Sequence, residues 1–422
     1  MRRLLLALLL SAATVFASAA AQSKPTVIEV PHPDNAAAQI AKHYVVLVSI
    51  DGFRYDYAKL YGAPHLDAIA KAGASAPDGM LPVYPSVTFP NHYTLVTGLY
   101  PEHHGIVAMN FYDPARKQRY AFNDPQTVTD GTWYRGVPLW SLAEKQGMRA
   151  ACFFWPGSEA EIAGQRPSYY LHYDDTVPDE ARVTQVVDWL ELPESKRPHF
   201  ITLYFGEVDH TGHRFGPDAP ETRAAVRHVD SVIGVLRARL AKLHLPIDLV
   251  IVSDHGMAAE QGDWINLDQY ADFTGVETAG ALMYADSDQA AAKLYSKLRT
   301  VNGKFKVYRR SKMPPELNYR DDARIGDPVI VPTGPYSIRV HSPADAAGDR
   351  PPNKGVHGYD PNAMPQMRAI FYAEGPDIRP GVRLKQFENV NVHPWLAEIL
   401  GLNAPETDGD GAVLDPALVA TH

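Results

Sequence analysis

Aspartate and histidine residues follow three strongly apolar segments of the chain. Asp51 comes directly after the first segment, Asp209 and His213 come shortly after the second, and Asp254 and His255 follow the third. In open α/β sheets the carboxyl ends of the strands line the ligand crevice, so residues far apart in sequence meet there. Carboxylate oxygens combined with imidazole nitrogens suit zinc, less well manganese or iron, and poorly calcium or magnesium.

Each of these signals has a plain alternative when it is taken alone. Asp51 before a glycine is also typical of a turn, and His357 is also typical of a loop residue. The case for a metal site rests on these aspartates and histidines taken together, because the packing of buried strands does not require such residues at the strand ends. We interpret four further histidines as surface or hydrogen-bonding residues rather than ligands: His92, His103, His104 and His210.

A threonine stands where a helix is expected to begin. Pro90 suits the first turn of a helix that continues to Gly98, which puts Thr88 at its N-terminus. Free backbone N–H groups and the helix dipole favour a phosphate at such a position. Coordination to zinc would make the threonine hydroxyl a nucleophile. The alternative is that Thr88 only caps the helix.

Strands and helices are expected to alternate around these residues. Continuous apolar runs at 44–50, 199–205 and 247–252 predict strands buried on both faces. Helical spacing predicts helices at 138–146, 183–190, 226–240 and 392–400. The alternation predicts an α/β fold with a mostly parallel central sheet and helices on both faces. Residues 257–345 are interpreted as a small inserted subdomain of short strands with one helix near 290–298.

Composition narrows the class of protein. The 422 residues are 45% hydrophobic, enough for a large core, and the lone Cys152 excludes an internal disulfide. The formal charge is −9, which lacks the basic footprint of a nucleic-acid scaffold. We therefore expect a small-molecule partner. The oligomeric state is not predicted.

The first residues have the features of a secretory signal. Two arginines precede an apolar run, and small residues end it, which predicts a signal peptide over 1–21 cleaved after Ala19 or Ala21. The alternative is a retained membrane anchor. We expect a loose N-terminal arm at 22–42, a single catalytic domain at 43–405 and a C-terminal tail at 406–422. No later stretch is apolar enough to span a membrane, and the cleaved signal peptide predicts a periplasmic or secreted location.

Six ordered segments resemble the nucleotide pyrophosphatase/phosphodiesterases of the alkaline phosphatase superfamily, in their bacterial secreted form. The resemblance extends from about Val45 to Leu402. The segments are Val-Ser-Ile-Asp-Gly-Phe-Arg (48–54), Thr-Phe-Pro-Asn-His-Tyr-Thr-Leu-Val-Thr-Gly (88–98), Phe-Trp-Pro-Gly-Ser (154–158), Asp-His-Thr-Gly-His (209–213), Ser-Asp-His-Gly-Met (253–257) and Gly-Val-His-Gly-Tyr (355–359).

The resemblance implies an alkaline-phosphatase-like fold and two zinc ions per chain. It implies one ligand set of Asp51, Thr88, Asp254 and His255, and a second set of Asp209, His213 and His357. It further implies that Thr88 attacks phosphorus and becomes covalently modified, that water then releases the product, and that nucleotides are split to nucleoside 5'-monophosphates.

Aromatic residues near the motifs are candidates for stacking a nucleobase. These are Phe89, Phe154, Tyr173 and Tyr204, for which ordinary core packing is the alternative. Aromatic stacking tolerates different bases, so the sequence does not name one.

One departure from the family concerns the phosphate. The family usually has an asparagine four residues after the glycine of the His-Gly-Ile segment, where its amide contacts a phosphate oxygen. Here that position is Met109, and Asn110 follows it. Either the loop shifts by one residue and Asn110 serves as the donor, which we favour, or the donor is lost.

Three other functions stay open at this stage. The same zinc site would serve a phosphodiesterase for choline-containing lipids or glycerophosphodiesters. A phosphate monoesterase would need extra cationic contacts that the sequence does not reveal. A zinc-holding binding protein without catalysis would require the Met109 change to mean that activity is lost.

Overall fold

The structure is a computed structural model that describes residues 25–262, 264–301, 303–340 and 353–419. The expected signal peptide lies outside these residues, as does most of the Pro/Gly/Asp-rich loop at 344–354.

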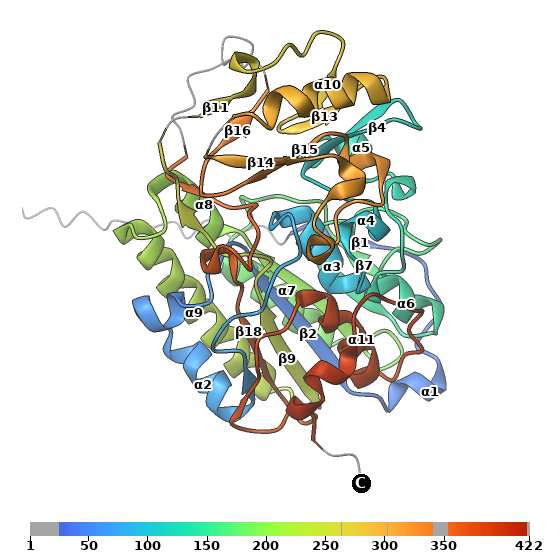
Figure 1. Ribbon diagram of the computed structural model, residues 1–422. Coiled ribbons are helices and arrows are strands. Elements are labelled where there is room, and N and C mark those ends of the chain that lie inside the picture. The colour runs from blue at the N-terminus through green and yellow to red at the C-terminus, as the bar shows by residue number, and fades with distance from the viewer. Residues whose placement is uncertain (1–24, 263, 302, 341–352, 420–422) are drawn as a thin grey trace, which may run out of the picture.

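A single large sheet forms the centre of the molecule (Figure 1). Strands β2 (Tyr44–Ile50), β8 (Phe200–Phe205) and β9 (Ile247–Val252) occupy its middle and pair in parallel. Within the described residues the sheet has nine strands, in the order β1-β7-β6-β8-β2-β9-β18-β3-β19. The others are β1 (Ile28–Glu29), β7 (Tyr169–Tyr170), β6 (Ala150–Phe153), β18 (Phe371–Glu374), β3 (Ala74–Ser75) and β19 (Val382–Arg383).

Strand β2 is buried on both faces, as its continuous apolar run predicts. Val45 and Leu47 belong to one core cluster, whereas Val46 and Val48 belong to the other. Successive side chains of a strand point to opposite faces, so each face of the sheet has its own core.

Helices cover both of these faces. One core contains residues of α3 (Thr88–Thr97), α6 (Leu139–Lys145) and α11 (Val392–Ile399). The other contains residues of α2 (Pro64–Ala72), α7 (Asp179–Leu190) and α9 (Pro220–Ala241). The predicted α/β class is therefore confirmed. In the described part of the chain, no helix combines the length and apolar character that crossing a membrane requires.

A small subdomain lies between β9 and β18 in the chain. It contains α10 (Asp288–Leu298), the hairpin of β12 (Glu277–Ala279) with β13 (Leu282–Tyr284), and the pair β14 (Phe305–Tyr308) with β15 (Val329–Pro332). It also contains β11 (Ile265–Asn266) paired with β16 (Ile338–Arg339). These elements enclose their own apolar cluster around Met283, Leu298 and Phe305, and Figure 1 shows them at one end of the molecule.

Both ends of the described chain pack against the domain. The arm expected at 22–42 is not loose from residue 25 on, because β1 pairs with β7 and the Asn35 side chain donates to the carbonyls of Glu194 and Arg197. Near the C-terminus, the 3-10 helix Gly411–Ala417 buries Leu414 and Ala417. Both segments are mostly polar in sequence, so the few residues that anchor them to the domain are not evident from composition.

Replacing Leu47 with alanine tests how far the central strand supports the fold. Leu47 is completely buried in the middle of β2. We expect Leu47→Ala to lower the free energy of unfolding by about 2–5 kcal/mol, because it leaves a cavity in a packed core. The measurement is urea unfolding, with Leu60→Ala, whose side chain is 54% exposed, as the control. Equal losses in the two variants would contradict the role assigned to β2.

Candidate metal centre and active site

The carboxyl ends of the central strands bring the first predicted ligand set together. Asp51 follows β2, and Asp254 and His255 follow β9 in the neighbouring position of the sheet. His255 Nε2 lies 3.0 Å from Asp254 Oδ2 and 3.6 Å from Asp51 Oδ1. All three side chains are buried, and the Gly52 N–H donates to Asp254 Oδ1 at 3.2 Å.

Thr88 is the first residue of α3 and reaches the same centre. Its Oγ1 lies 3.3 Å from His255 Nε2. The residue at the cap position is Val87, and no side chain caps the helix. The alternative that Thr88 serves as the cap is therefore wrong, and its hydroxyl is directed at the ligand set instead.

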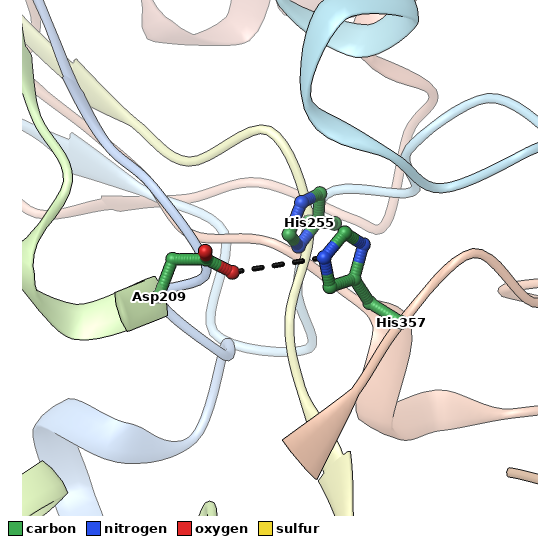
Figure 2. Close-up of side chains that lie close together, drawn as sticks. All are labelled: Asp209, His255 and His357. Carbon is green, nitrogen blue, oxygen red and sulfur yellow. Dashed lines mark ion pairs between the residues drawn. The ribbon is translucent and has the colours of Figure 1, made fainter. Parts of the chain in front are cut away.

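The second predicted set adjoins the first. Asp209 comes from α8 (Glu207–Phe215), the helix that follows β8, and Figure 2 shows it facing His357 and His255. Asp209 Oδ1 lies 3.5 Å from His213 Nε2 and 3.7 Å from His357 Nε2. The rings of His255 and His357 stack with centroids 3.6 Å apart, so the two sets form one continuous centre.

Backbone carbonyls orient the three imidazole rings. His213 Nδ1 donates to the Gly355 carbonyl at 2.8 Å, and His357 Nδ1 donates to the Ser86 carbonyl at 2.9 Å. His255 Nδ1 donates to the Gly256 carbonyl at 2.9 Å. A ring that carries its proton on Nδ1 presents the Nε2 lone pair as a metal ligand. No sequence pattern points to these three carbonyls.

The donor atoms fit divalent cations. Nε2 of His213 and Nε2 of His357 lie only 3.0 Å apart, so two lone pairs face each other unless a cation lies between them. One carboxylate oxygen on each of Asp51, Asp209 and Asp254 is buried without a hydrogen-bond partner. Buried polar atoms are ordinarily satisfied, so these orphaned oxygens indicate places for metal ions.

The electrostatics of the centre point the same way. Burial, and then the charges of Asp254 and Asp209, raise the pKa of Asp51 well above its usual range. Burial, and then the neighbouring His255 and His213, depress the pKa of His357. Burial also opposes the ionisation of Asp254, but the nearby His255 and His92 outweigh it and lower the pKa of Asp254. Carboxylates gathered this closely are stabilised by cations, and a neutral His357 is free to bind one.

Two supporting residues link the centre to the fold. The Tyr204 hydroxyl donates to Asp51 Oδ2 at 2.6 Å. His92 is fully buried, and its Nδ1 lies 2.9 Å from the Thr88 carbonyl and 3.4 Å from Asp254 Oδ2. Its Nε2 contacts Ser49 Oγ of β2 at 2.8 Å. The expected hydrogen-bonding role of His92 is correct, and its place one helical turn after Thr88 was the available signal.

Ser86 is a functional candidate that the sequence reasoning missed. Its carbonyl holds His357, while its hydroxyl donates to the Tyr359 carbonyl at 2.7 Å. It therefore ties the loop before α3 to the loop that carries His357. A serine two residues before Thr88 is too common a pattern to reveal this role.

The four aromatic candidates divide into two kinds. Phe154 and Tyr204 are buried, which favours the core-packing alternative for these two rings. Phe89 is only partly buried, and Tyr173 is 48% exposed and lines a cavity of about 750 Å³. The 39% exposed Phe122, which the sequence reasoning did not include, packs edge-on against Phe89.

Met109, the residue at which the chain departs from the family pattern, lies beside the start of α3. Met109 Sδ accepts a hydrogen bond from the Phe89 N–H at the start of α3, at 3.3 Å. Asn110 begins β4 (Asn110–Asp113) and is exposed. Of these two neighbours, Met109 is the residue that contacts the start of α3, and the role of Asn110 as phosphate donor stays a prediction.

This centre on this sheet places the chain among the alkaline-phosphatase-like α/β proteins. Within that class the chain belongs to the type I phosphodiesterase / nucleotide pyrophosphatase family, whose pattern its residues 45–360 match. The family resemblance stated from the motifs is thereby confirmed.

Relatives with known sequences include proteins from animals and fungi. The chain is 34% identical over 392 residues to human ectonucleotide pyrophosphatase/phosphodiesterase family member 1, covering 88% of this chain and 41% of the human protein. It is 34% identical over 397 residues to an uncharacterized pyrophosphatase/phosphodiesterase of Schizosaccharomyces pombe, covering 89% of this chain and 80% of that protein. The chain thus spans about two fifths of the human relative.

A solved structure gives a similar result. Murine ectonucleotide pyrophosphatase/phosphodiesterase 5, determined as an inactive form in complex with AMP, superimposes with a TM-score of 0.82 at 29% identity. The superposition covers 90% of this chain and all of the murine chain.

Removing the Tyr204 hydroxyl tests the support of Asp51. We expect Tyr204→Phe to weaken metal binding by about 10- to 100-fold, because it removes the hydrogen bond that orients a ligand carboxylate. Competition with a chromogenic chelator measures the affinity. Tyr173→Phe is the matched control, since that hydroxyl belongs to a half-exposed ring. Equal affinity in Tyr204→Phe and the wild type would contradict this role.

Proposed function

We propose that this protein is a zinc-dependent hydrolase of phosphodiester and pyrophosphate bonds in nucleotides and related esters. Thr88 is the proposed nucleophile, and a nucleoside 5'-monophosphate is the proposed product. The observation that carries the proposal is the position of Thr88. It is the first residue of α3, and its Oγ1 lies 3.3 Å from His255 Nε2 in a centre of carboxylates and imidazoles.

The N-terminus of α3 suits a phosphoryl group. Its first-turn N–H groups and the positive end of its dipole favour an anion. Val87 at the cap position offers no side-chain oxygen to these donors, and the Phe89 N–H has the weakly accepting Met109 Sδ as its partner. A substrate phosphate bound there would have its phosphorus next to Thr88 Oγ1.

Two groups of residues would hold the two proposed zinc ions. They are Asp51, Thr88, Asp254 and His255 for one ion, and Asp209, His213 and His357 for the other. Bound zinc supplies a lowered pKa for the nucleophile and positive charge opposite the leaving oxygen. The family membership and the orphaned carboxylate oxygens support this use of the centre.

The chain's own groups would then carry the reaction in two steps. Thr88 Oγ gives up its proton to solvent and bonds to phosphorus while the bond from phosphorus to the leaving oxygen breaks; the leaving oxygen takes up a proton, and a nucleotidyl ester of threonine remains. A water oxygen then bonds to phosphorus as the bond from phosphorus to Thr88 Oγ breaks, which releases the monophosphate, and a proton from that water restores the Thr88 hydroxyl. Throughout, His92 holds the Thr88 carbonyl and Tyr204 holds Asp51, so the reacting groups keep their positions.

The aromatic surfaces support a nucleoside as one part of the substrate. Tyr173 and Phe89 keep exposed ring area on which a purine or pyrimidine can stack. AMP bound to the murine relative is consistent with such a product. A panel of ATP, a nucleotide sugar, lysophospholipid and glycerophosphocholine separates nucleotides from choline-type esters, which remain the alternative substrates.

We also propose that the protein acts in the periplasm or outside the cell. The basic and apolar start of the chain and the venom phosphodiesterases among its relatives support this location. N-terminal sequencing of protein exported from a bacterial host tests it, with a new terminus after Ala19 or Ala21 as the expected result.

Removing the Thr88 hydroxyl tests the mechanism. We expect Thr88→Ala to abolish release of AMP from ATP and of p-nitrophenol from a nitrophenyl nucleotide ester, because no nucleophile remains. Thr88→Ser is the matched control and should keep measurable turnover, since its hydroxyl is retained. Metal content should be checked in both variants. Turnover by Thr88→Ala within about tenfold of the wild type would overturn the proposal, because losing a covalent nucleophile costs far more.

Exchanges at Met109 and Asn110 test the phosphate contact. We expect Met109→Asn to raise kcat/KM by up to about a hundredfold, because an amide donor stabilises the developing charge. Asn110→Ala should change kcat/KM by less than about twofold, since its side chain is exposed at the start of β4 and Met109 is the residue that contacts α3. A large loss in Asn110→Ala together with no gain in Met109→Asn would restore Asn110 as the donor.

A further inference from the structure

A second cluster of metal-binding residue types lies at the opposite edge of the central sheet. His43 immediately precedes β2, and Asp248 is the second residue of β9. Asp377 comes from the loop after β18. Because β2 and β9 run in parallel, their amino ends share an edge. This edge is the one remote from Asp51 and Asp254, which follow the carboxyl ends of the same two strands.

The ligand atoms of this cluster converge. One imidazole nitrogen and two carboxylate oxygens lie within 4.8 Å of one another. His43 Nδ1 is 2.7 Å from Asp377 Oδ2, and the Asp377 backbone N–H donates to Asp248 Oδ1 at 3.0 Å. Asp248 has no exposed surface, whereas the side chains of His43 and Asp377 are each 34% exposed. Solvent therefore reaches one side of the cluster, and Asp248 closes the other.

The second oxygen of Asp248 provides independent evidence for a ligand. Asp248 Oδ2 is buried and has no hydrogen-bond partner. Among the described aspartates, this feature recurs only at Asp51, Asp209 and Asp254, which are the carboxylates of the candidate metal centre. In the described part of the chain, the only ion pair to Asp248 or Asp377 comes from His43. Two adjacent carboxylates, one of them fully buried, thus lack a compensating lysine or arginine.

We propose that His43, Asp248 and Asp377 bind a divalent cation, with zinc as the favoured ion. One nitrogen and two oxygens are a donor set that suits zinc better than calcium or magnesium. Tetrahedral zinc separates its ligand atoms by about 3.3 Å, so the present spread of distances needs only side-chain adjustment. Water from the exposed side completes the coordination.

The position of the site defines its role as a structural clamp. It joins the amino ends of β2 and β9 to the loop after β18. That loop packs tightly against Asp248. A Cβ atom on Gly375 would overlap both Asp248 Oδ1 and Asp248 Cα. Gly375 has φ of +152°, so a side chain at this position would also strain the backbone. The cation therefore stabilises the two strands that carry active-site ligands at their far ends.

Zinc content of the full chain tests the site. Wild type, His43→Ala, Asp377→Asn and His103→Ala are dialysed against the same buffered zinc, and bound zinc is measured by mass spectrometry. His103 is the matched control, because its Nδ1 lies 2.7 Å from Asp408 Oδ2 in a surface pair of the same geometry. We expect one zinc fewer per chain in His43→Ala and Asp377→Asn than in the wild type and His103→Ala.

Equal zinc content in all four proteins would overturn the site and would leave a proton shared by Asp248 and Asp377 as the alternative. The difference between variants is the readout, so the result does not depend on how fully the active site is occupied. Crystals of the wild type keep the test decisive if a variant fails to fold. An anomalous difference peak at the zinc edge between His43, Asp248 and Asp377 would support the site, and its absence would overturn it.

Discussion

The crowding of three buried aspartates is the constraint on which the rest of the site depends. Asp51, Asp209 and Asp254 bring three carboxyl groups to one edge of the sheet, where burial removes the solvent that would screen their charges and raises the pKa of Asp51. Such a cluster persists only with compensation. The imidazoles that present Nε2, the Tyr204 hydroxyl and the N–H of Gly52 all provide it from the protein side. Divalent cations would provide the remainder.

Much of the fold and most of the candidate metal centre could be predicted from the sequence, because both depend on short sequence patterns: apolar runs that form strands and polar residues that follow them. The run at Tyr44–Ile50 is too apolar to have a solvent-facing side, so it marks a central strand, and the polar residues that end such strands must meet at one edge. Thr88 could be placed because a proline fixed the start of its helix.

Sequence reasoning is weakest where side-chain direction decides the outcome. Met109 and Asn110 are neighbours in sequence, but Met109 contacts the start of α3, whereas Asn110 begins β4 with an exposed side chain. Phe154 adopts a positive φ that no apolar pattern reveals, and its ring packs inward against Phe153 and Tyr173. The carbonyls of Gly355, Ser86 and Gly256 orient the imidazoles, yet every residue has a carbonyl, so no sequence signal identifies these three.

The uncapped start of α3 has a consequence for protein engineering. Valine at the cap position forgoes about 1 kcal/mol that serine, aspartate or asparagine would contribute there. A stability screen would therefore favour a polar replacement at Val87. Such a side chain would compete for the Phe89 N–H, which donates to Met109 Sδ and which the proposed phosphate would use, so the more heat-resistant variant is expected to be the slower one. Under the proposed function, the first turn of α3 gives up stability so that this N–H can serve a substrate.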